Sequence, residues 1–95
     1  MIVIKNDGRK EEFNVDKIIN AVYKAFQSCN KERPEYLSKS IETLFNLKGD
    51  TIGVEEIQNM VEQLLMNDKF FDVAKSYIIY REKHKQARFI RERLD

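Results

Sequence analysis

Apolar residues near the start of the chain follow a strand pattern before helical spacing takes over. The β-branched run at 2–4 suits a strand, and the Asn-Asp-Gly sequence at 6–8 supplies turn chemistry. Residues 9–13 can then return as the partner strand. The opening segment is therefore typical of a β-hairpin.

Two registers are compatible with this hairpin, and they place different side chains on one face. A two-residue loop at 7–8 would place Val3 and Lys5 on the face opposite to Glu11 and Phe13. A turn through 6–7 with Gly8 in the left-handed position is favoured, because Asn-Asp-Gly suits two right-handed residues followed by a left-handed one. The residues that then share one face, with Lys5 opposite Arg9 and Val3 opposite Glu11, are Val3, Lys5, Arg9, Glu11 and Phe13.

Beyond the hairpin, apolar residues at helical spacing predict four helices. Asn14 is a good N-cap for a first helix that continues to about Gln27. Pro34 suits the first position of a second helix, which Gly49 closes. The inner positions of these two helices are Val15, Ile18, Ile19, Val22, Ala25 and Phe26, then Leu37, Ile41, Leu44 and Phe45.

The second half of the chain repeats the helical pattern after a short interruption. Thr51-Ile52 is compatible with a third strand before Gly53, and a loop at 66–69 separates a third helix from a fourth that begins near Phe70. The inner positions are Val54, Ile57, Met60, Val61, Leu64 and Leu65, then Phe70, Val73, Ala74, Tyr77, Ile78 and Arg81.

These elements predict an α+β fold, in which a small β-hairpin or three-stranded sheet caps a four-helix bundle. With 95 residues the chain has room for one domain, which we place at 1–88. The segment 89–95 is predicted to be a charged extension of the last helix that projects from the domain.

Composition limits the classes of partner. The formal net charge is +1, so the field of the whole molecule attracts neither nucleic acid nor a membrane, and any anion site must be local. The apolar runs are far shorter than the roughly 18 residues that span a bilayer. The single cysteine, Cys29, is expected as a small half-buried side chain and fits a reducing compartment. A soluble cytoplasmic protein is predicted.

The inventory of reactive side chains argues against catalysis. There is one histidine, His84, which is expected to be solvated, and no serine or cysteine stands in a nucleophile–base context. The three glycines form neither a Walker phosphate loop nor a dinucleotide fingerprint, and no metal-ligand spacing occurs.

The favoured hairpin face carries the components of a nucleotide site. Val3 and Phe13 offer apolar contact for a flat ring, and the Glu11 carboxylate can accept from an exocyclic amine. Lys5 and Arg9 supply positive charge for phosphates. The alternative interpretation is that these charges are solvated and only protect a sheet edge.

The start of the first helix adds to this face. Its free backbone N–H groups and dipole favour an anion beside Asn14. Lys17 lies in the first turn, where a cation is disfavoured by about 0.3 to 1 kcal/mol unless something negative lies there. Its position indicates a bound phosphate.

Three stretches resemble the ATP-cone, a regulatory nucleotide-binding domain found at the N-terminus of ribonucleotide reductases. The opening VIKNDGRKEEFNVDKI is similar to the family pattern V-x-K-R-D-G-R-x-x-x-F-x-x-x-K-I. VEEIQNMVEQLL at 54–65 and DVAKSYIIYREKH at 72–84 also agree with it, and the ending looks most like the anaerobic (class III) reductases.

This resemblance implies an allosteric module without catalytic residues of its own. It would bind ATP or dATP with Mg²⁺ and control the activity or oligomeric state of a reductase, whose catalytic domain or a second copy would be its partner. The contacts it implies are Val3, Lys5 and Asn6 on the nucleotide, Glu11 and Asn14 on adenine, Phe13 and Ile18 as apolar contacts, Lys17 and Lys83 on phosphates, and Val54 and Gln58 at the start of the third helix.

One position departs from the family pattern. Asn6 stands where the family has arginine, which removes a charge-assisted phosphate contact of about 1.5 to 3 kcal/mol unless Arg9 compensates.

A different class of function is a protein-interaction or nucleic-acid-binding module acting through the last helix. The segment 81–95 holds six Lys or Arg residues, but Glu82, Glu92 and Asp95 interrupt the basic patch.

Overall fold

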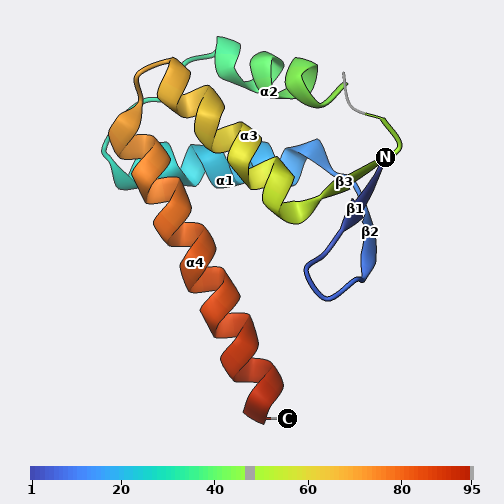
Figure 1. The fold of residues 1–95 in the computed structure, drawn as a ribbon. Coiled ribbons are helices and arrows are strands. Elements are labelled where there is room, and N and C mark those ends of the chain that lie inside the picture. The colour runs from blue at the N-terminus through green and yellow to red at the C-terminus, as the bar shows by residue number, and fades with distance from the viewer. Residues whose placement is uncertain (47–48, 95) are drawn as a thin grey trace.

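Three short strands and four helices follow one another in the predicted order (Figure 1). The computed structural model describes the backbone of residues 1–46 and 49–94, and the side chains of these residues up to Lys83. The elements are β1 (Ile2–Ile4), β2 (Lys10–Glu12), α1 (Val15–Ser28), α2 (Tyr36–Asn46), β3 (Thr51–Gly53), α3 (Val54–Asn67) and α4 (Phe71–Leu94). The α+β fold class is confirmed.

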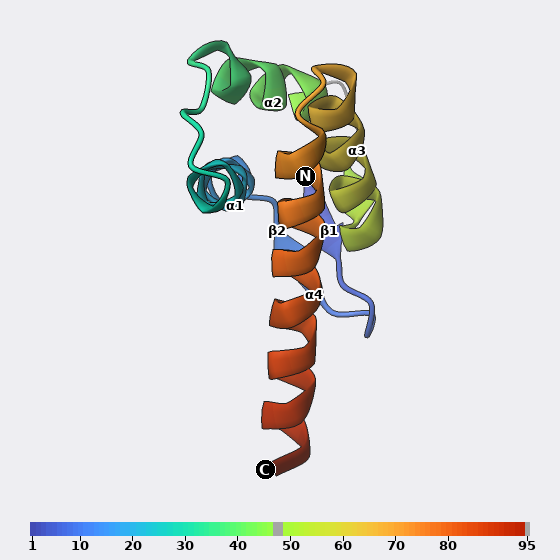
Figure 2. The ribbon, with the colours of Figure 1, turned by 90° about the vertical axis from the view of Figure 1, so that its left-hand side faces the viewer.

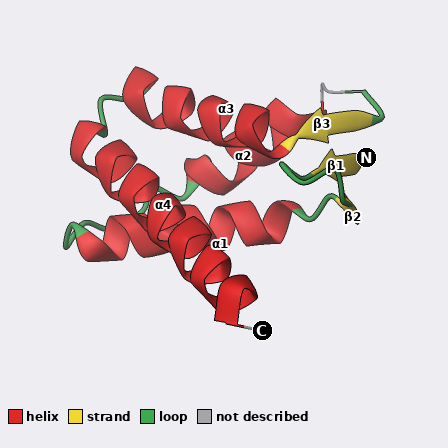
Figure 3. Cartoon of the chain, turned by 60° about the horizontal axis from the view of Figure 1, so that its bottom comes forward, coloured by secondary structure: helices red, strands yellow, loops and turns green. Residues whose placement is uncertain are grey.

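The sheet has three strands, which decides between the two predicted forms. Its order is β2-β1-β3, with β1 antiparallel to β2 and parallel to β3 (Figure 3). Val3 is opposite Glu11 on one side and Ile52 on the other. The central strand therefore joins the hairpin to the segment that leads directly into α3.

The hairpin adopts the favoured register. The Gly8 N–H donates to the Lys5 carbonyl at 2.9 Å, and the Lys5 N–H donates to the Arg9 carbonyl at 2.8 Å. Gly8 has φ of +87°, the left-handed region that a side chain would strain. The Asp7 carboxylate accepts from the Arg9 N–H at 3.0 Å and tightens the turn.

The predicted start of the first helix is confirmed, whereas that of the second is not. Asn14 caps α1 as expected, because its side-chain oxygen accepts from the Asp16 N–H at 3.0 Å. The predicted start of the second helix at Pro34 is wrong by two residues, since α2 begins at Tyr36. Pro34 belongs instead to the preceding turn, where its carbonyl accepts from the Leu37 N–H at 3.2 Å. The predicted closure near Gly49 involves residues 47–48, outside the described residues.

The core lies between the helices and one face of the sheet. α4 packs against α1 and α3, and α2 packs against α1. Two aromatic pairs connect distant segments: Phe13 with Phe45, whose centroids are 5.2 Å apart, and Phe26 with Phe70, at 5.1 Å. The buried side chains are Val3, Ile18, Val22, Ala25, Phe26, Leu37, Ile41, Phe45, Ile52, Ile57, Val61, Leu65, Val73, Ala74 and Tyr77.

The last helix is the longest element. Figures 1 and 2 show its C-terminal half extending beyond the other helices, on the same side as the turn of the β1–β2 hairpin. The division into a domain at 1–88 and an extension at 89–95 stays a prediction. No helix within the described residues has the length and apolar character needed to cross a membrane. Cys29 is half-buried, as expected.

Candidate functional site

The hairpin brings two of the predicted ligand-binding side chains into direct contact. The Lys5 Nζ lies 3.2 Å from the Glu11 Oε2, diagonally across β1 and β2. The Lys5 side chain is 20% exposed and that of Glu11 51%, so an incoming ligand can reach both. The pair combines a carboxylate acceptor with a cation on one accessible face.

Arg9 has a partner that the sequence did not indicate. Its Nε lies 2.6 Å from the Asp7 Oδ2, and both side chains are exposed. The hydrogen bond from the Arg9 backbone N–H, followed by the charge of the guanidinium, holds the pKa of Asp7 below its ordinary value. Arg9 is therefore engaged by the turn, and a phosphate would have to compete with Asp7 for it.

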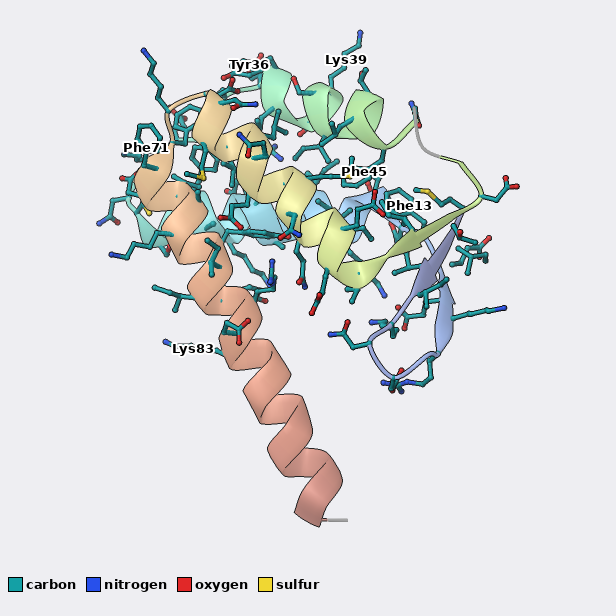
Figure 4. All side chains as sticks on the ribbon, viewed as in Figure 1. Phe13, Tyr36, Lys39, Phe45, Phe71 and Lys83 are labelled. Carbon is teal, nitrogen blue, oxygen red and sulfur yellow. The ribbon has the colours of Figure 1, made fainter. Side chains whose placement is uncertain are left out.

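The apolar residues of the predicted site differ in what they can offer. Val3 and Ile18 are only 8% and 9% exposed, so they belong mainly to the core. Phe13 is half-buried and packs its ring on Phe45, between the sheet and the end of α2 (Figure 4). Phe13 thus presents the more accessible apolar surface beside the hairpin.

The start of α1 follows the hairpin directly. The side-chain oxygen of Asn14 is occupied by the Asp16 N–H, which leaves the amide NH₂ of Asn14 as the group that can donate to a ligand. Lys17 is exposed in the first turn, as predicted. Asp16 lies in the same turn, so the helix already has one favourable negative charge at this end.

The first turns of α3 border the same sheet. Val54 and Gln58 are both half-buried and lie one helical turn apart, directly after β3. Glu62, also half-buried, continues this row by another turn. Gly53 serves as the N-cap of α3 without a side-chain hydrogen bond.

Lys83 is the predicted residue that the structure does not bring toward the hairpin. It is exposed on α4, and Figure 4 shows it projecting from the side of the helix that faces away from β1 and β2. Its assignment as a phosphate ligand stays a prediction. His84 and the basic residues that follow have side chains outside the described part of the chain, so nucleic-acid binding by this helix also stays a prediction.

Arg81 is a basic residue of α4 that the predicted site did not include. Its Nη1 atom is buried and has no hydrogen-bond partner within the described part of the chain. It follows the buried Tyr77 by four residues and so continues the inward face of the helix. The helical spacing had already placed Arg81 among the inner positions of this helix, although it was not assigned a contact with the ligand.

The arrangement suits reversible binding of an anion with an attached ring. It offers an acceptor at Glu11, a cation at Lys5, an apolar ring at Phe13 and a capped helix start beside them. Among the described residues, no group of three or more His, Cys, Asp or Glu side chains is placed to hold a metal ion.

The fold and this surface define a small α+β domain with an accessible polar face on its hairpin. Compared with known protein families, residues 1–86 match the ATP cone domain. The chain belongs to the ATP-cone family.

Relatives with curated names are ribonucleotide reductases and a repressor. The vitamin B12-dependent ribonucleoside-diphosphate reductase of Thermoplasma acidophilum is 40% identical, over 90% of this chain and 12% of the reductase. The anaerobic ribonucleoside-triphosphate reductase of Haemophilus influenzae is 34% identical, over 97% of this chain and 14% of the reductase. The transcriptional repressor NrdR of Caldicellulosiruptor saccharolyticus is 32% identical, over 97% of this chain and 62% of the repressor. The chain therefore spans a small fraction of these reductases and more than half of the repressor.

Proposed function

We propose that this chain is a regulatory domain that binds ATP or dATP, with Mg²⁺, and controls the activity or oligomeric state of a ribonucleotide reductase. The observation that carries the proposal is the Lys5–Glu11 pair on an accessible hairpin face beside the start of α1, in a chain of the ATP-cone family. In this proposal the protein is cytoplasmic.

The chemistry of the face fits an adenine nucleotide. The Glu11 carboxylate accepts from the exocyclic amine of adenine, and the free NH₂ of Asn14 donates to a ring nitrogen. Lys5 then turns from Glu11 toward the phosphates, where Lys17 and the N–H groups of α1 add positive potential. Phe13 contacts the flat face of the base or sugar.

Regulation rather than catalysis fits both the residues and the relatives. The hairpin face offers binding groups but no arrangement of nucleophile and base to attack a phosphate. The reductases match this chain over only 9 to 14% of their length, so the catalytic part of such a partner would lie in other residues. Mg²⁺ would be carried by the phosphates of the nucleotide.

Isothermal titration calorimetry tests the proposal directly. ATP, dATP and GTP are titrated into the chain with Mg²⁺, and binding of the adenine nucleotides in preference to GTP is expected. Lys5→Ala should weaken ATP binding, whereas Lys39→Ala, an exposed lysine on α2 away from the hairpin (Figure 4), should not. Absence of heat from any adenine nucleotide at millimolar concentration would overturn the proposal.

A transcriptional repressor is the second candidate for the protein that this domain serves. The similarity to the NrdR repressor over 62% of its length favours it. Sedimentation velocity of the chain with ATP and with dATP would show whether the nucleotide alone changes its self-association, which either kind of parent protein could use.

A further inference from the structure

We propose that the Arg81 guanidinium is a phosphate-binding group of α4, held ready on the inward face of the helix for the nucleotide phosphates. This inference rests on the proposed function, and it adds a residue to which neither the family resemblance nor the hairpin chemistry gave a ligand contact.

The burial of Arg81 without a partner is the first observation. Val73, Ala74 and Tyr77 form the buried stripe of α4, and Arg81 occupies the next position on that face. Its Nη1 atom is shielded from solvent and has no hydrogen-bond acceptor among the described residues. Leaving a charged donor in this state costs free energy, because water is lost and nothing replaces it.

The groups around Arg81 do not neutralise it. Burial raises the pKa of the Tyr77 hydroxyl to about 12, with Arg81 acting to lower that pKa and Glu62 to raise it. Tyr77 therefore stays uncharged at neutral pH and cannot pair with the guanidinium as an anion. No ion pair joins Arg81 to Glu62 within the described residues, although both charges act on the same hydroxyl.

Arg81 lies on a helix that packs against α1 and α3, the two helices that contribute to the proposed site. The half-buried Glu62 lies on the same row of α3 as Val54 and Gln58. The hairpin turn and the C-terminal half of α4 extend from the same side of the molecule (Figures 1 and 2). Lys83, by contrast, projects from α4 away from the hairpin (Figure 4).

A phosphate would supply the hydrogen-bond acceptors that the Arg81 guanidinium lacks among the described residues. A guanidinium presents two parallel N–H donors that match two oxygens of one phosphate. Because the Arg81 side chain is only half-buried, its guanidinium can keep Nη1 sheltered while other nitrogens meet the ligand. Binding would then connect the nucleotide to the helix that leaves the domain.

Substitution of Arg81 by methionine separates this role from a structural one. Met keeps the apolar stem but removes a buried unpaired charge, so the unfolding temperature without ligand should stay the same or rise. The affinity for ATP should fall by about 10- to 100-fold, the value of a hydrogen bond to a charged group. The matched control is Arg33→Met, which removes a half-buried arginine stacked on Tyr23, 5.3 Å from its ring centroid, and should leave ATP affinity unchanged.

Calorimetry and thermal unfolding with ATP, adenosine and tripolyphosphate give the deciding results. If Arg81→Met binds ATP and tripolyphosphate more weakly than wild type but binds adenosine equally well, the proposal is supported. If Arg81→Met binds ATP with wild-type affinity, the proposal is overturned. It is also overturned if adenosine binding falls as much as ATP binding and the unfolding temperature is lower. If Arg81→Met does not fold, Arg81→Gln takes its place with the same two expectations. If the wild-type chain binds no ATP, the proposed function fails. Stabilisation by tripolyphosphate in wild type but not in Arg81→Met would then still support the Arg81 anion site, and equal behaviour would overturn it.

Discussion

The carboxylate of Glu11 is the residue that would distinguish adenine from guanine. A carboxylate only accepts hydrogen bonds, so it suits the exocyclic amine of adenine and opposes the O6 acceptor at the same position of guanine. Its Oε2 lies 3.2 Å from the Lys5 Nζ, and this ion pair holds the carboxylate in position on the hairpin face. In the proposed site, this side chain would therefore favour adenine over guanine.

Glu11→Gln is expected to reduce the preference for ATP over GTP by about tenfold, since an amide can turn its NH₂ toward a guanine acceptor. Calorimetric titration of both nucleotides measures the ratio. Glu12→Gln is the matched control, because Glu12 is the next residue of β2 and points to the opposite face of the strand. Unchanged selectivity in Glu11→Gln would assign adenine recognition to other residues.

Asp72 forms an ion pair whose contribution to stability depends on pH. Its Oδ2 lies 2.7 Å from the Lys31 Nζ, joining the loop after α1 to the first turn of α4. The hydrogen bond from Lys31, followed by that from the Val73 N–H, holds the pKa of Asp72 below its ordinary value of 3.8. A carboxyl whose pKa is lower in the folded than in the unfolded protein stabilises the fold at pH values above its unfolded pKa. This contribution is lost as the pH falls from the unfolded pKa through the folded pKa.

Asp72→Asn should therefore lower the free energy of unfolding slightly at pH 7, and the difference from wild type should shrink below pH 3.8. Urea unfolding at pH 7 and near pH 2.5 measures both differences. A gap that stays constant with pH would mean that the loss comes from packing or capping and not from the charge of Asp72.

At the scale of elements, local signals in the sequence predicted most of the fold because those signals are themselves physical constraints. Asn14 caps α1 and Gly8 has a positive φ, as the turn and cap chemistry required. Pro34 was misplaced because a proline also fits the turn before a helix, which the spacing of apolar residues does not exclude.

The role of the basic residues of α4 was the part that sequence pattern left open. The helical spacing predicted Tyr77 and Arg81 on the inward face, and both are there, whereas Lys83, which was chosen from the family resemblance, is exposed. Similarly, the ion pair between Arg9 and Asp7 depends on turn geometry that residue types do not define. The hairpin register and the cap at Asn14 could therefore be predicted from local sequence, whereas the contacts made where distant helices meet could not.

The dual role of Asn14 leads to a prediction for the start of α1. Asn14→Ala removes the cap and should cost about 1 kcal/mol of stability, whereas Asn14→Asp keeps an oxygen acceptor for the Asp16 N–H. Both variants lose the amide NH₂ that we propose donates to adenine, so both should bind ATP more weakly. Thermal unfolding and calorimetry on the same samples separate the two effects. Full ATP affinity in Asn14→Asp would restrict Asn14 to capping.

At the scale of the whole molecule, the hairpin is connected to the helical body through aromatic packing. Phe13 follows β2 and rests on Phe45 at the end of α2, with ring centroids 5.2 Å apart (Figure 4). Leu37, at the other end of α2, is completely buried but lies far along the helix from this contact. Only one end of α2 therefore supports the hairpin face.

Phe45→Ala and Leu37→Ala should both destabilise the fold, by about 3 to 5 and 2 to 5 kcal/mol, because each leaves a cavity in a core whose total stability is about 5 to 15 kcal/mol. Only Phe45→Ala removes the support of Phe13, so only this variant should also bind ATP more weakly. Urea unfolding with and without ATP measures both quantities, since a ligand at a hundred times its Kd adds about 2.7 kcal/mol to the free energy of unfolding. The same increment is expected for Leu37→Ala and wild type, and a smaller one at the same ATP concentration for Phe45→Ala. Equal increments in all three proteins would show that the hairpin face keeps its binding geometry without the Phe13–Phe45 contact.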